Sequence, residues 1–111
     1  MTFAGHLRLQ VKDNAPLLNI RLAGELDLGT ATQLKQAVDA YARTGQTVTI
    51  DLRDVTFIDS MGLAALVRAR HRALARGGAL QLVPPSAATL RVFELTRLDR
   101  VFTWVAPGSP D

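Results

Sequence analysis

A single serine stands where a strand-like run gives way to a helix-like run, in the segment "VTFIDSMGLA" (55–64). Ser60 follows Asp59 and precedes Met61 and Gly62. A hydroxyl in this position can cap a helix, attack a substrate or accept a phosphoryl group. Serine is a preferred N-cap residue because its oxygen accepts a hydrogen bond from a free amide of the first turn. Position alone therefore favours the cap.

The nucleophile hypothesis lacks the residues that it needs. A hydrolase serine sits in G-x-S-x-G, whereas Ile58 occupies the place of the first glycine here. The candidate bases are His71, about three turns along the same predicted helix, and His6, at the edge of the first predicted strand. Neither gives a triad pattern with Ser60. The sequence predicts a protein that is not an enzyme.

The phosphate hypothesis has a physical basis. A helix N-terminus offers free amides and a favourable dipole to an anion. Phosphorylation would add about −1.5 to −2 charges at one exposed point, beside the carboxylate of Asp59. A partner that presents carboxylates there would be repelled, so one modification could switch off an interface.

The remaining segments predict the elements that must position this serine. Alternating apolar residues predict strands over 6–11, 16–24, 46–52 and 79–83. Helical spacing predicts helices over 31–45, 60–76 and 87–96, and 100–105 is a last strand or extended tail. The first two strands form an antiparallel hairpin, and the later alternation implies parallel pairing. The predicted fold class is α/β, with a mixed four- to five-stranded sheet and helices mainly on one face.

Details of these elements are also predicted. Thr30 can cap the first helix and Gly45 can end it, while Ser86 can cap the third. Residues 53–59 read as a loop between the third strand and the serine.

Composition narrows the class of protein. The chain has 111 residues, of which 48% are hydrophobic and 21% charged, with a formal net charge of +3. This predicts one soluble domain over 1–111, with a flexible tail from about 106 to 111. The sequence has no cysteine and two histidines, and it predicts neither a metal nor a bound cofactor. No apolar run approaches the ~20 residues of a membrane span, and no signal peptide precedes the first strand. We therefore expect a cytoplasmic protein that does not enter a membrane.

The second predicted helix is strongly basic. It carries Arg68, Arg70, Arg72 and Arg76, with no acidic residue between 60 and 77. The ordinary interpretation is a solvated face whose cations suit the C-terminal end of the helix dipole. The arginines are spread around the helix and no aromatic residue interleaves with them, so we expect no direct contact with nucleic acid. An acidic protein is the more plausible partner.

Three motifs in order resemble one family. "GELDLGTA" (24–31), "VTIDLRDV" (48–55) and "FIDSMGL" (57–63) are similar to the STAS domain of bacterial anti-sigma factor antagonists. The resemblance runs from the first strand through Phe93, and its specificity lies in the combination. Many members carry a second serine after the first, where this sequence has Met61.

The resemblance implies a function and a set of residues. Such proteins bind an anti-sigma factor that is also a serine kinase, and thereby release a sigma factor. The kinase phosphorylates a serine at the start of the second helix, which breaks the complex, and a serine phosphatase restores binding. The implied phosphorylation site is Ser60. The implied partner-binding residues are Glu25, Asp27, Asp59, Ser60, Met61 and Gly62.

Other interpretations stay open at these positions. The acids of 24–27 can simply favour the next helix N-terminus, Asp59 can orient its loop, and Gly62 can serve close backbone packing. The alternative function is a STAS scaffold subunit of a transporter-associated or stress-signalling complex, in which Ser60 is only structural. Sheet edges and apolar helix faces also allow a homodimer.

Overall fold

The computed structural model describes residues 6–107 and contains one five-stranded sheet in the order β1-β2-β3-β4-β5. The strands are β1 (Leu7–Asn14), β2 (Leu17–Leu26), β3 (Thr47–Ile58), β4 (Ala79–Val83) and β5 (Thr103–Trp104). The helices are α1 (Ala31–Tyr41), α2 (Ser60–Ala75), α3 (Ala87–Leu95) and the short 3-10 turn η1 (Leu98–Arg100). β1 and β2 pair antiparallel, and the other neighbours pair parallel. The predicted mixed α/β fold is confirmed.

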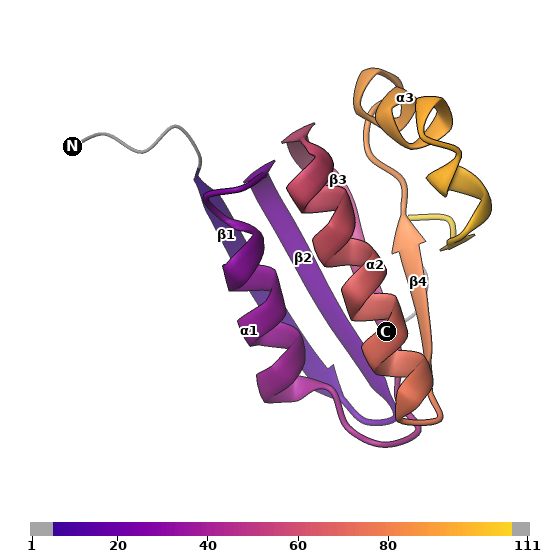
Figure 1. Ribbon diagram of the computed structural model, residues 1–111. Helices are drawn as coiled ribbons and strands as arrows, with labels where there is room; N and C mark the ends of the chain where they lie inside the picture. The colour runs from indigo at the N-terminus through magenta and orange to yellow at the C-terminus, as the bar shows by residue number, and fades with distance from the viewer. Residues whose placement is uncertain (1–5, 108–111) are drawn as a thin grey trace.

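The two faces of the sheet differ in chemistry because each strand alternates. In β2, Leu18, Ile20 and Leu22 are fully buried. On the opposite face, Arg21 pairs with Asp54 at 2.7 Å, in an exposed ion pair. α1 and α2 lie side by side over the apolar face (Figure 1). The prediction that helices cover mainly one face is confirmed.

The last elements close the far edge of the sheet. Phe93 of α3 is fully buried, and its ring meets Trp104 of β5 edge-on at a centroid distance of 5.2 Å. The Trp104 indole Nε1 donates a hydrogen bond to the carbonyl of Asp99 at 2.8 Å. Residues 100–105, predicted as a strand or extended tail, therefore supply a short strand. Of the predicted tail, residues 108–111 lie outside the described part of the chain.

Two predicted boundaries were wrong. β3 does not stop at residue 52 but continues to Ile58, so most of the predicted loop over 53–59 is strand. Its pairing with β2 shifts register between Arg21 and Ala23 and again between Gly24 and Glu25. These irregularities break the alternation that marks a strand in sequence. α1 ends at Tyr41, four residues before Gly45, because the chain becomes extended at Ala42.

Within residues 6–107, no helix is long and apolar enough to cross a bilayer. The same described residues hold no group of three or more acidic or histidine side chains arranged to bind a metal ion.

Candidate functional site

Asp59, not Ser60, is the N-cap of α2. One carboxylate oxygen of Asp59 accepts a hydrogen bond from the amide of Gly62 at 2.9 Å. The other accepts from the amide of Leu28 at 3.1 Å. The expectation that Ser60 caps the helix was wrong, because the side chain of Asp59, one residue earlier, already accepts a bond from the first turn. Asp59 thereby ties the start of α2 to the loop that follows β2.

The Ser60 side chain is exposed and makes no hydrogen bond with the described residues of the chain. It is the first residue of α2 and lies at one end of a shallow groove between α2 and the segment around Leu98. His71 lines the same groove but stands eleven residues later on the helix, about 16 Å along its axis. His6 lies just before β1, where its carbonyl accepts from the amide of Glu25. His71 is therefore too far along the helix to take a proton from Ser60.

Gly62 permits a close approach between α2 and the end of β2. A Cβ atom at this position would lie 2.1 Å from the carbonyl oxygen of Leu26, which is far inside contact distance. The amide of Asp59 also donates to that carbonyl, at 3.3 Å. The packing interpretation of Gly62 is therefore confirmed, and it explains how Ser60 is brought beside the β2 loop.

The loop between β2 and α1 is held by its own polar groups. Thr30 Oγ1 accepts from the amide of Asp27 at 3.0 Å and donates to the carbonyl of Glu25 at 2.7 Å. An Asp27 carboxylate oxygen accepts from the amide of Gly29 at 2.9 Å. Thr30 precedes α1 as predicted, but its side chain makes no capping bond to the helix. The Ser86 side chain likewise makes no capping bond to α3.

Three large apolar side chains lie exposed near Ser60. Leu28 is 70% exposed, Phe57 51% and Met61 43%. We call them the apolar rim. Leu28 belongs to the loop that Asp59 ties down, and Phe57 pairs in register with Glu25 at the ends of β3 and β2.

Sequence reasoning found Met61 but missed the other two. Simple alternation would bury Phe57 with Val55, which is buried. The register shift between Gly24 and Glu25 separates the two positions and turns Phe57 outward. Leu28 follows Leu26 at the same spacing and carries no sequence sign of exposure.

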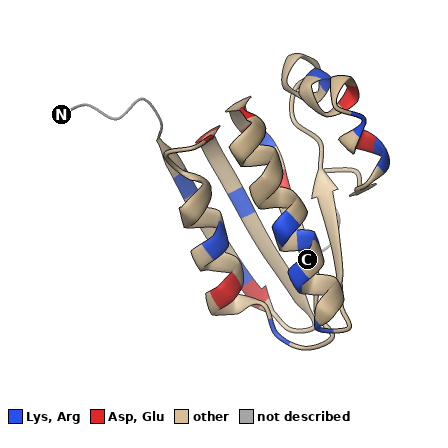
Figure 2. Cartoon of the chain, in the orientation of Figure 1, with Lys and Arg blue, Asp and Glu red and all other residues tan. Residues whose placement is uncertain are grey.

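The charges near Ser60 are negative. Glu25, Asp27 and Asp59 stand at the ends of β2 and β3, whereas the basic residues of α2 lie toward its other end (Figure 2). The structure thus gathers the acidic candidates around one exposed, unbonded hydroxyl. Their expected contact with a partner stays a prediction.

The chain is similar to known proteins over most of its length. The family model described as "Mlab, STAS domain" matches residues 7–105. The chain belongs to the STAS domain family. An anti-sigma-B factor antagonist of Bacillus subtilis is 31% identical over 93 residues, covering 84% of this chain and 85% of the relative. One from Listeria monocytogenes is 32% identical over 98 residues, covering 86% of each.

A solved structure extends the likeness to three dimensions. The crystal structure of an anti-sigma factor antagonist from Mycobacterium paratuberculosis matches this STAS domain with a TM-score of 0.78 and 30% identity. The match covers 92% of this chain and 86% of the other. The predicted resemblance to STAS-domain anti-sigma factor antagonists is confirmed.

Proposed function

We propose that this STAS domain is an anti-sigma factor antagonist. It binds an anti-sigma factor with serine kinase activity and so releases a sigma factor. Phosphorylation of Ser60 ends the binding, and a serine phosphatase restores it. ATP is used by the kinase, and this chain contributes the acceptor hydroxyl.

The observation that carries the proposal is the state of the Ser60 hydroxyl. It is exposed and has no hydrogen bond to the described residues, because Asp59 caps α2 in its place. A kinase can therefore reach the hydroxyl without breaking a contact that holds the fold. The amides and dipole at the start of α2 favour the added negative charge in the free protein.

The surroundings of Ser60 explain why a phosphate would break a complex. The apolar rim offers Leu28, Phe57 and Met61 to an apolar partner surface. A phosphate in the middle of that contact would have to lose water without a matched cation, which is costly. Repulsion from any partner carboxylate adds to the cost, and Asp59 makes the local field more negative.

The test uses three baits in a pull-down from lysate of the native host: wild type, Ser60→Ala and Ser60→Asp. Mass spectrometry identifies the retained proteins, and the purified kinase is then incubated with ATP and each bait. We expect a kinase-type anti-sigma factor to bind wild type and Ser60→Ala and to bind Ser60→Asp at least about tenfold more weakly, or about 1.4 kcal/mol. Phosphate should appear on wild type only.

Ser86→Asp is the matched control, because Ser86 is exposed at the start of α3 and gains the same charge at a comparable helix position. It should bind as wild type does. Equal binding by all four baits would instead indicate that the domain is a constitutive scaffold in which Ser60 has no regulatory role.

A further inference from the structure

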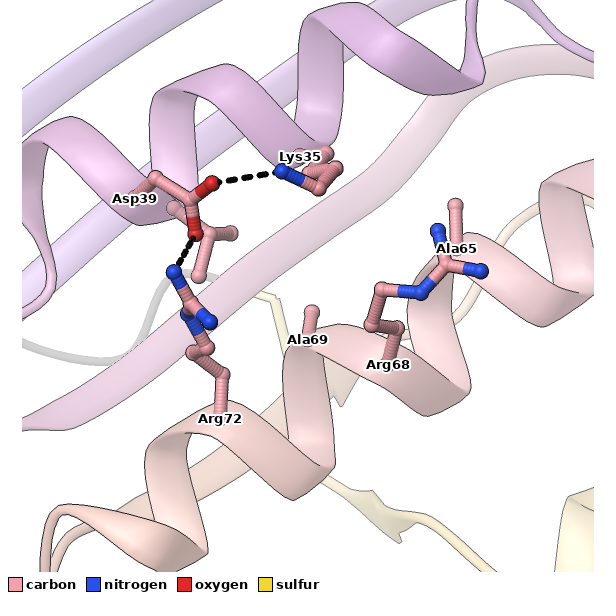
Figure 3. Close-up of a pocket in the computed structure, with 7 residues that line it drawn as sticks. Lys35, Asp39, Ala65, Arg68, Ala69 and Arg72 are labelled. Carbon is pink, nitrogen blue, oxygen red and sulfur yellow. Dashed lines mark hydrogen bonds and ion pairs between the residues drawn. The ribbon is translucent and has the colours of Figure 1, made fainter.

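A second charged surface lies on the outer side of the two long helices. Lys35 of α1 and Arg68 and Arg72 of α2 surround a small crevice (Figure 3). We call these three residues the cationic face. It starts two helical turns from Ser60, since Arg68 is eight residues and about 12 Å along α2.

The cationic face has more positive charge than its own acid can neutralise. Among residues 6–107, Asp39 is the only acidic residue that lines the crevice. Its carboxylate accepts from Lys35 at 2.9 Å and is paired with Arg72 at 2.5 Å. Arg68 has no ion-pair partner among residues 6–107, and Figure 3 shows its side chain apart from the two marked contacts. Three cations therefore face outward against a single carboxylate.

The floor of the crevice is apolar. It consists of Val38 from α1 and of Ala65 and Ala69 from α2. The space above these side chains is only about 20 Å³, which suits a group no larger than a methyl, and the cations stand at its margin. A segment that combines carboxylates with small apolar side chains matches both parts of this surface.

Nucleic acid matches the same surface poorly. In the described part of the chain, the residues that line the crevice include no aromatic side chain on which a base could stack. An extended polyanion that continued along α2 would also meet Asp59 and Asp27 near its first turn. A short acidic protein segment avoids that repulsion because it covers only the crevice.

We propose that the cationic face docks an acidic segment of a protein partner, rich in small apolar side chains, at a site separate from Ser60. The contact is mainly electrostatic at its margin, so it speeds association and weakens as salt rises.

The test is an NMR titration of the isotope-labelled protein with a short peptide of alternating glutamate and alanine. The same peptide with glutamine in place of glutamate is the peptide control. We expect amide shifts concentrated over residues 35–39 and 65–72, and no saturable shifts with the glutamine peptide. Arg68→Glu should raise the Kd for the peptide at least about fivefold. A charge reversal at a distant residue should change the Kd less than about twofold.

Arg91→Glu is the control variant, with its charge reversed at a residue distant from the crevice. Arg91 is exposed on α3 and has no ion pair among the described residues, so it changes net charge equally without touching the crevice. Equal loss in both variants would overturn the proposal, since it would reduce the effect to net charge. Shifts centred on Arg21, on the uncovered side of the sheet, would overturn it as well. So would tighter binding of a short DNA duplex or of phosphatidylglycerol vesicles at the same ionic strength.

The outcome is separable from the proposed switch. Arg68 also lines the groove that holds Ser60, but the two residues lie about 12 Å apart along α2. Ser60→Asp should therefore weaken peptide binding much less than Arg68→Glu does. Failure of the peptide titration would rule out the docking surface without affecting the phosphorylation proposal. Failure of the pull-down would rule out the phosphorylation switch without affecting the docking surface.

Discussion

The first turn of α2 is held to the end of β2 by a close backbone approach and by the Asp59 carboxylate, whereas Arg72 in the C-terminal half contacts α1 through an exposed ion pair. At the first turn, Gly62 lies against Leu26, and Asp59 binds amides on both sides of the junction. Farther along, Arg72 reaches Asp39 across the helix pair. Backbone contacts fix position within a fraction of an ångström, while exposed ion pairs tolerate movement.

The largest expected effect comes from Gly62→Ala. The added methyl would lie 2.1 Å from the Leu26 carbonyl, so α2 must shift away from β2. We expect a loss of about 3 kcal/mol in the free energy of unfolding, measured by urea denaturation. Gly29→Ala is the control, because its Cβ would meet only the Asp27 carboxylate at 3.4 Å. If both substitutions cost the same, close approach does not govern this junction.

A smaller effect is expected from Asp59→Ala. The change leaves the amides of Gly62 and Leu28 without their acceptor. We expect a loss of about 1–2 kcal/mol in the free energy of unfolding. Ser60→Ala should cost less than about 0.5 kcal/mol, since that hydroxyl bonds to none of the described residues. If urea midpoints showed a larger loss for Ser60→Ala than for Asp59→Ala, Ser60 and not Asp59 would be the capping residue.

The smallest effect on stability is expected from the ion pairs between Asp39 of α1 and its partners, Lys35 and Arg72. The hydrogen bond from Lys35 lowers the pKa of Asp39, and Arg72 lowers it further. A lowered pKa in the folded state stabilises the protein at pH values above the unfolded pKa, and this stabilisation is lost as pH falls through the folded value. Asp39→Asn should therefore lower the urea midpoint slightly at neutral pH and match wild type in strongly acidic buffer.

Glu94→Gln serves as its control, because Glu94 is exposed on α3 without an ion pair among residues 6–107. It should leave the midpoint unchanged throughout. High salt should also shrink the Asp39→Asn difference. A difference that persists at low pH would mean that Asp39 acts through packing and not through its charge.

The sequence predicted the order of elements because most of them keep a clear period. β2 and α2 show regular apolar spacing, and their predicted positions agree closely with the structure. The apolar periodicity did not predict the second half of β3. Val55 and Ile58 are both buried although they lie three residues apart, a spacing that the irregular register allows and a regular strand forbids.

The candidate site was predicted in part. The motif placed the acids and Ser60 at one end of the molecule, and the bond from the Leu28 amide to Asp59 bears out their proximity. The choice of cap between Asp59 and Ser60 was not readable, because both residue types cap helices and they are adjacent. The exposure of Leu28 and Phe57 depends on a loop conformation and a register shift, which no local pattern encodes.

The unbonded hydroxyl of Ser60 has a consequence for how such domains diverge. Because Asp59 supplies the side-chain cap of α2, the Ser60 hydroxyl has no bonding role in the fold of residues 6–107. A duplicated copy of the gene can exchange this serine for alanine in a single step and still give a folded product. Under the proposed switch, a regulated and a permanently active version of the domain would therefore differ by one substitution, and both would fold.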